Sequence, residues 1–156
     1  MIKYGLLVNE KNENLGDDIQ SYAEAQFLPR VDVMVDREKL NTFKYGDGTD
    51  PVALIMGAWF MWKKWNWPPA KQLVPLNVGY HHFDREKDIF ESKSYAIPIY
   101  REHYKSVGGD WFKSYGKVGC RDNHTCKVLD EAGIPNYFSG CVTLTLPKQK
   151  ETKDKG

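Results

Sequence analysis

The sequence predicts an α/β protein built on a mostly parallel sheet, and three features of the chain indicate this class. Short runs of apolar, β-prone residues recur and end in polar or glycine-bearing turns, as residues 2–8 do. Such near-continuous apolar strands are expected where helices cover both faces of a parallel sheet. Segments with helical spacing of apolar residues alternate with these runs, and capping residues and prolines mark their ends. Together these features predict a Rossmann-like sheet with helices on both faces.

The first 36 residues contain the opening β-loop-α-β unit of that sheet. Residues 2–8 are the first predicted strand, and residues 31–35 are the second. Between them, Asp17 and Asp18 open a helical pattern, at the end where the helix dipole favours acidic side chains. Pro29 ends this helix. Four apolar residues are expected on its buried face: Ile19, Tyr22, Ala23 and Phe27.

The rest of the chain repeats the alternation. Further strands are expected at residues 52–56, 76–80, 117–120 and 137–146, the last broken near Gly140, with helical turns at 37–40 and 109–115. Asp122 is the predicted N-cap of another helix, which ends at Gly133, a residue suited to the left-handed C-terminal position. The buried face of this helix is expected to carry Thr125, Val128, Leu129 and Ala132.

Length and composition exclude several classes of protein. A chain of 156 residues fits one domain, here residues 1–146, followed by a charged tail at 147–156 that is expected to be disordered or a linker. The net charge of +1 indicates no nucleic-acid partner. No apolar run is long enough to span a bilayer, and the first residues do not resemble a signal peptide. The three cysteines lack CxxC spacing, which argues against a disulfide framework or a zinc knuckle. We therefore expect a cytoplasmic protein without a membrane span.

Polar, glycine-bearing or histidine-bearing segments follow several predicted strands. In open α/β sheets, ligands bind beyond the carboxyl ends of the strands, so these segments predict one shared cleft. They are residues 12–18, 57–60, 81–82, 121–122 and 139–141.

The loop at Asn14 and Gly16 has two interpretations. Backbone N–H groups at a helix N-terminus form a ready anion site, but the same residues also suit a tight turn that caps the helix. The carboxylates of Asp17 and Asp18 would repel an anion. They suit the hydroxyls of a sugar better, or the removal of a proton from one.

The remaining candidates are equally open to a structural interpretation. Asp122 is either only a cap or, beside Arg121, a group that orients a ligand. His81 is a candidate acid or base; a metal pair with His82 is disfavoured because adjacent strand residues point to opposite faces. Trp59 belongs to a tryptophan-rich segment that either stacks on sugar rings or packs a loop. The cysteines are expected to be small core residues, and spacing evidence for a cysteine hydrolase is lacking.

The same segments resemble polysaccharide pyruvyl transferase family proteins, over most of the chain as far as Leu146. The nearest likeness is Val118-Gly119-Cys120-Arg121-Asp122 with Thr125. The segment 57–61 departs from the family pattern, which more often has Gly-Trp-Phe there. The other matching segments occur in order, at residues 14–22, 35–38, 66–69, 133–135, 137–141 and 143–146.

The resemblance implies the N-terminal half of a GT-B fold, which has two Rossmann-like domains. It implies transfer of the pyruvyl group of phosphoenolpyruvate, as co-substrate, to hydroxyls of a sugar or polysaccharide acceptor, without a cofactor or a metal. The donor would be held mainly by a second domain or chain onto which no segment here maps, and a homo-oligomer is a further expectation. On this hypothesis Asp18 or Asp122 is the catalytic base. The substrate-binding residues would be Asn14, Gly16, Asp17, Trp59, His81, Arg121 and Ser139. The alternative is a non-catalytic Rossmann-like module that binds a sugar, a nucleotide or a protein partner.

Overall fold

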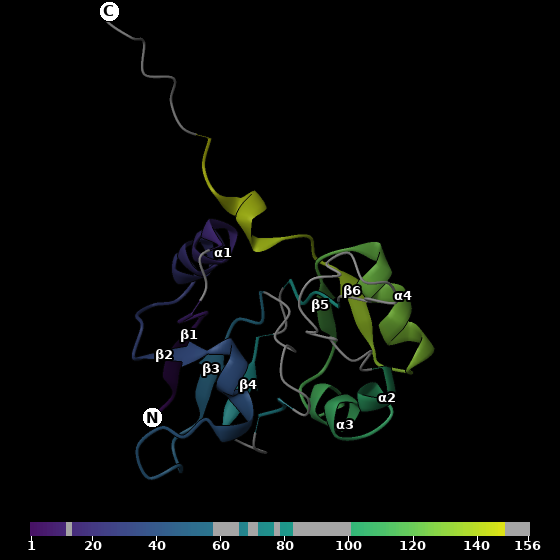
Figure 1. Cartoon of the computed structure of the whole chain (residues 1–156), viewed down its shortest axis with the longest axis horizontal. Helices are drawn as coiled ribbons and strands as arrows, with labels where there is room; N and C mark the ends of the chain where they lie inside the picture. The colour runs from purple at the N-terminus through teal and green to yellow at the C-terminus, as the bar shows by residue number, and fades with distance from the viewer. Residues whose placement is uncertain (12–13, 58–65, 69–71, 77–78, 83–100, 149–156) are drawn as a thin grey trace, which may run out of the picture.

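A computed structural model of the chain describes residues 1–11, 14–57, 66–68, 72–76, 79–82 and 101–148. Helices and short parallel strands alternate in this part of the chain (Figure 1). Its strands are β1 (Lys3–Val8), β2 (Val33–Asp36), β3 (Val52–Leu54), β4 (Leu73–Pro75), β5 (Val118–Cys120) and β6 (Asn136–Phe138). Its α-helices are α1 (Leu15–Ala25), α2 (Arg101–Tyr104), α3 (Val107–Lys113) and α4 (Asn123–Glu131), and its 3₁₀ helices are η1 (Arg37–Thr42) and η2 (Val142–Thr145).

The strands form a four-stranded sheet in the order β2-β1-β3-β4 and a two-stranded sheet of β5 and β6, and every pairing is parallel. A single bridge at Tyr80 joins the carboxyl side of β4 to β5. The Tyr80 N–H donates to the Gly119 carbonyl, and the Arg121 N–H donates to the Tyr80 carbonyl, both at 2.8 Å. This arrangement confirms the predicted α/β class with a mostly parallel sheet. Because β2 and β3 lie on opposite sides of β1, the order in which strands are added to the sheet reverses at β1, and a crevice is expected at the carboxyl ends of β1 and β3.

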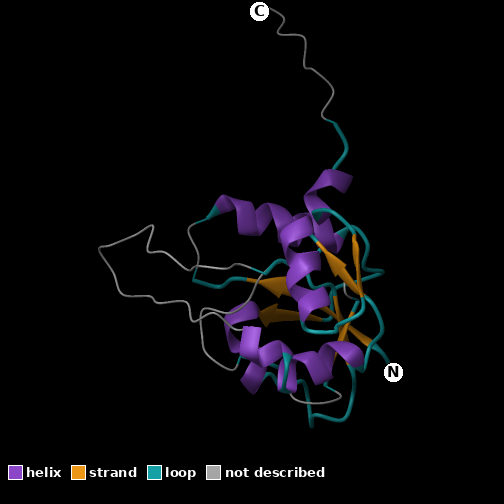
Figure 2. Ribbon diagram, turned by 90° about the vertical axis from the view of Figure 1, so that its right-hand side faces the viewer, coloured by secondary structure: helices purple, strands orange, loops and turns teal. Residues whose placement is uncertain are grey.

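The core lies between the strands and the helices (Figure 2). All residues of β3 and β5 are buried, as a parallel sheet covered by other elements requires. On the β5 side an aromatic cluster fills the core, and its rings meet mostly edge to face. Trp67 lies 5.4 Å from Phe112 and 6.1 Å from Tyr104, measured between ring centroids. Tyr80 lies 4.9 Å from Phe112.

Helix α4 matches its prediction closely. Asp122 is its N-cap and accepts a hydrogen bond from the Thr125 N–H at 2.8 Å. Gly133 follows the helix with φ of +66°, a conformation in which a Cβ would be strained. Three of the four residues predicted for its buried face, Thr125, Val128 and Leu129, are buried, and the fourth, Ala132, is the C-cap and is partly buried.

The predicted buried face of α1 is wrong. Three of the four residues predicted to be buried are exposed: Ile19 to 39%, Tyr22 to 67%, and Phe27, which lies beyond the helix end, to 58%. The fourth, Ala23, is buried. The helix instead turns Asp17 and Glu24 toward β1. Its N-cap is Asn14, so the helix begins before the expected position.

Two strand boundaries also differ from the expectation. The fourth strand lies at Leu73–Pro75 rather than at 76–80. Proline usually disfavours a strand, but here Pro75 ends the strand and pairs with Leu54 of β3. The last strand ends at Phe138. Gly140 has φ of +75°, and the chain then crosses to pack η2 against α1 (Figure 1).

Some expectations fall outside the described residues. Trp59 and residues 149–156 of the charged tail are among them. Within the described part, no helix is long and apolar enough to cross a membrane.

Candidate functional site

A histidine–aspartate pair lies at the carboxyl ends of the Tyr80 segment and β5. The His81 Nδ1 and Asp122 Oδ2 atoms are 2.5 Å apart, although 41 residues separate the two in the chain. The parallel pairing of Tyr80 with Cys120 causes this contact, because it brings His81, the first residue after Tyr80, and Asp122, the second residue after Cys120, to the same sheet edge. The side chains of His81 and Asp122 keep 21% and 34% of their surface exposed. The pair is therefore accessible to a ligand.

The environment keeps this pair in its neutral-histidine, ionised-aspartate form. Burial lowers the pKa of His81 and outweighs the raising effect of Asp122, and electrostatic interactions with Arg121 and His124 lower it further. Burial alone would raise the pKa of Asp122, but hydrogen bonds from the Thr125 backbone and from His81 bring it below its usual value. A neutral imidazole that donates Nδ1–H to a carboxylate carries its basic lone pair on Nε2. This geometry suits a general base.

Buried hydrogen bonds hold the backbone beneath the pair. The His82 N–H donates to the Thr125 hydroxyl at 2.9 Å, which ties the histidine segment to α4. The His82 Nδ1 atom lies 2.7 Å from the Tyr104 hydroxyl, which lies 2.7 Å from the Tyr80 hydroxyl. Since Tyr80, His82 and Tyr104 are all buried, His81 projects from a rigid support.

Ser139 joins three segments next to this pair. Its hydroxyl accepts a hydrogen bond from the Gly79 N–H at 3.0 Å and donates to the Cys120 carbonyl at 3.1 Å. The predicted substrate-binding residue thus has a structural part in placing the β6 end against the His81 segment. A Cβ on Gly79, whose φ is +76°, would lie 3.5 Å from the Gly140 carbonyl oxygen, so the chains cross closely here.

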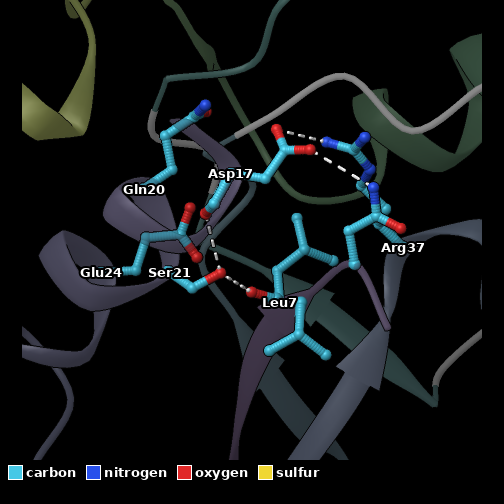
Figure 3. A pocket seen from close by; sticks show the side chains of 8 residues that line it. Leu7, Asp17, Gln20, Ser21, Glu24 and Arg37 are labelled. Carbon is cyan, nitrogen blue, oxygen red and sulfur yellow. Dashed lines mark hydrogen bonds and ion pairs between the residues drawn. The ribbon is translucent and has the colours of Figure 1, made fainter. Parts of the chain in front are cut away.

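A second polar group follows β1 (Figure 3). Asp17 is buried and forms an ion pair with Arg37 at 3.0 Å, and it accepts a second hydrogen bond from the Asn9 amide at 3.3 Å. Arg37 is only 4% exposed. Asp17 is therefore neutralised within the fold. Its neighbour Asp18, by contrast, is exposed to solvent.

Glu24 is a buried acid that the sequence interpretation missed. Its side chain is 1% exposed and faces the Gly57 backbone. Burial raises the pKa of Glu24 well above the usual value, and Cys141 raises it slightly further. A hydrogen bond from the Gly57 backbone lowers the pKa but does not offset the effect of burial. A Cβ on Gly57 would overlap the Glu24 carboxylate, so glycine is required there. A charged residue at the end of an amphipathic helix gives no sequence signal of its burial. The available hint that a side chain packs closely at this place was Gly57, the glycine that follows the apolar strand.

The structure brings some predicted residues together and leaves others apart. His81, Arg121 and Asp122 form one group with Ser139 beside it, whereas Asn14, Gly16, Asp17 and Asp18 belong to the start of α1. Helix α1 packs on β1, while α4 packs on β5 and β6, and β3 and β4 lie between them (Figure 1). Asn14 accepts a hydrogen bond from the Gly16 N–H at 3.0 Å, so this N–H is already used in capping.

An apolar cavity of about 380 Å³ lies under the crossing of the chain from β6 to η2. Ile55, Leu76 and Ser139, which follow β3, β4 and β6, contribute to it, as do Phe27 and Cys141. This cavity has the size and the position of small-molecule sites in α/β proteins. Within the described residues, no group of three or more His, Cys, Asp or Glu side chains is arranged to hold a metal ion, and all three cysteines are free thiols.

We predict that the pKa of His81, followed by histidine NMR signals, lies below 6.5 and falls further in Asp122→Asn. The substitution removes the negative charge that favours the protonated ring, yet asparagine caps helices as well as aspartate does. Asp130→Asn on the same helix serves as the control and is expected to leave the His81 titration unchanged. An unaltered His81 pKa in Asp122→Asn would contradict the coupling of the two side chains.

Comparison of the chain with protein-family models, with curated proteins and with solved structures finds no match.

Proposed function

We propose that this chain is a Rossmann-like acceptor-binding half of a pyruvyl transferase, of the kind found at the N-terminus of GT-B folds. Its role is to bind a sugar at the carboxyl edge of the sheet and to deprotonate one of its hydroxyls. The contact between His81 and Asp122 is the observation that carries this proposal, because it supplies a base at a ligand-accessible edge. The resemblance in sequence supplies the reaction.

The geometry favours His81 as the base and Asp122 as the residue that positions it. Asp122 already accepts hydrogen bonds from His81, from the Thr125 N–H and from the Thr125 hydroxyl, and its lowered pKa makes it a weak base. A neutral histidine accepts a hydroxyl proton near pH 7 more readily than a stabilised carboxylate does. Asp18, the other base considered from the sequence, is exposed at the start of α1 and remains a weaker candidate.

The charges near the pair fit an uncharged acceptor better than the donor. Phosphoenolpyruvate carries several negative charges and needs converging cations. Among the described residues, Arg121 is the cationic side chain that acts on His81. The donor would therefore be held mostly by another domain or chain. In the overall reaction, two sugar hydroxyls form a ketal at the enol carbon; one of their protons goes to the methylene carbon and the other leaves with phosphate.

The test is a pyruvyl-transfer assay with phosphoenolpyruvate and a panel of sugar acceptors, in which phosphate release is measured with and without an added donor-binding domain. We expect turnover with that domain present, and a loss of about 10²- to 10⁴-fold in kcat for His81→Gln. Asp122→Asn is expected to lose less, and to shift the pH profile of kcat to lower pH, because it acts through His81.

Variant folding is checked by circular dichroism, and Asp130→Asn serves as the matched control. Folded wild-type protein that gives no turnover under either condition, or full activity in His81→Gln, would exclude this mechanism.

The alternative is a non-catalytic module that binds a sugar, a nucleotide or a protein partner. One observation favours a protein partner: Leu15, Ile19 and Tyr22 form an exposed apolar stripe along α1. Such a module would bind acceptor sugars or a partner chain equally well in His81→Gln, so the same variant separates the two functions.

A further inference from the structure

The small pocket between β1 and α1 contains a buried acid whose second oxygen has no hydrogen-bond partner among the residues that the structure describes. This atom is Oε2 of Glu24, whose side chain is 1% exposed. Gln20 contributes another buried oxygen, Oε1, for which the described part of the chain likewise offers no partner, while its Nε2 donates to the Gly16 carbonyl at 3.2 Å. Both side chains line the pocket from α1 (Figure 3). Buried polar atoms are usually satisfied, so two unpartnered oxygens at one place indicate a ligand.

The other polar groups of the pocket also favour a ligand that donates hydrogen bonds or carries positive charge. The Ser21 hydroxyl uses its proton on the Leu7 carbonyl at 2.7 Å and therefore offers a lone pair. Asp17 is neutralised by Arg37, so Glu24 is the carboxyl here that lacks a counter-charge. The pocket has room for about one water-sized group, which matches potassium or ammonium.

We propose that the pocket between β1 and α1 binds a small monovalent cation of ammonium or potassium size, with the carboxylate of Glu24 as its counter-charge and the oxygens of Gln20 and Ser21 as further ligands. The cation is either a free ion or the primary ammonium group of a larger ligand. A divalent metal fits less well, because it would require more than one carboxylate. This proposal does not depend on the pyruvyl-transfer function.

Binding exchanges a proton for the cation. Burial raises the pKa of Glu24 and favours its protonated form, so a bound cation displaces this proton and leaves a carboxylate–cation pair. The charged and titratable groups that face Glu24 are Asp17 of α1, Arg37 of η1 and Cys141 before η2. Asp17 and Arg37 neutralise each other, so proton release is assigned to Glu24.

The full chain is tested by thermal unfolding in KCl, in NH₄Cl and in methylammonium chloride, with tetramethylammonium chloride keeping the ionic strength constant. We expect a saturable rise in Tm of about 3–6 °C at ten times the Kd. Proton release of up to one per cation is measured in weakly buffered solution at pH 7. Glucosamine, compared with N-acetylglucosamine, shows whether the cation enters as part of a sugar; a response to glucosamine alone supports the ligand-borne source.

Glu24→Gln is expected to abolish both the Tm shift and the proton release while staying folded, because its neutral amide replaces a neutral acid. Gln20→Met is expected to raise the half-saturating concentration several-fold, and exposed Glu131→Gln serves as the matched control. The proposal is overturned if no cation gives a saturable shift, or if Glu24→Gln responds like the wild type.

Discussion

Arg37→Met is expected to lower the free energy of unfolding by about 3–5 kcal/mol, the largest effect that we predict for a single side chain. Arg37 and Asp17 are both buried, and their ion pair spans 3.0 Å. Removal of the guanidinium takes the ion-pair partner away from the buried Asp17 carboxylate, which also accepts a hydrogen bond from the Asn9 amide. An uncompensated buried charge is far more costly than the loss of the pair itself. Urea unfolding at pH 7, followed by circular dichroism, measures the change.

A double-mutant cycle separates the pair from the packing around it. Asp17→Asn combined with Arg37→Met should be more stable than the sum of the single effects predicts, because position 17 then carries no charge that needs the guanidinium. Glu38, whose Oε1 lies 3.3 Å from the Arg37 Nε, loses this ion pair equally in Arg37→Met and in the double variant. Lys39→Met on the same 3₁₀ helix is the control: Lys39 pairs with Glu10 at 2.7 Å and with Asp36 at 2.9 Å, but its own side chain is 54% exposed. Its unfolding midpoint should shift much less than that of Arg37→Met. Additive single effects would contradict a direct buried pair.

Glu24→Gln is expected to remove a large pH dependence of stability. Burial raises the pKa of Glu24 in the folded state, whereas the unfolded chain has the usual value of about 4.5. Above pH 4.5 the folded state therefore keeps a proton that the unfolded state has lost, and stability falls as pH rises. The slope approaches about 1.4 kcal/mol per pH unit until Glu24 ionises in the folded state. The variant lacks this slope, so it should exceed the wild type in stability at pH 8 and match it near pH 4.5.

Urea titrations between pH 4.5 and 8 in tetramethylammonium buffer measure this difference without a competing small cation. Glu131→Gln, an exposed acid on α4, should follow the wild-type curve. Parallel curves for wild type and Glu24→Gln would show that Glu24 is ionised in the folded protein. That result concerns protonation alone; cation binding is judged separately, by the response of Tm to potassium and ammonium.

The local elements could be predicted from the sequence where one pattern dominated. Apolar runs predict β1, β3 and β5, because strands of a covered parallel sheet need apolar side chains on both faces. Helix α4 was predicted with its cap at Asp122, its buried residues and its end at Gly133, since all three signals agree. Periodicity failed for α1, where the apolar residues Ile19 and Tyr22 are exposed.

The candidate site could be predicted only in part. That His81 and Asp122 lie at the same edge follows from the rule that parallel strands end together. Their contact depends on the pairing of Tyr80 with Cys120, across 40 residues. Glu24 was missed, because its burial depends on a glycine that lies 33 residues further along the chain.

By itself, then, the sequence determined the α/β class, the strand-ending segments and the capped helix at Asp122. The tertiary structure alone decided which face of α1 is buried, which carboxylate is neutralised and which histidine meets an acid. The physical reason is that hydrophobic periodicity shows only which residues on a helix face are apolar and which are polar. The neutralisation of a buried charge, by contrast, depends on a partner such as Arg37, which only folding brings to Asp17.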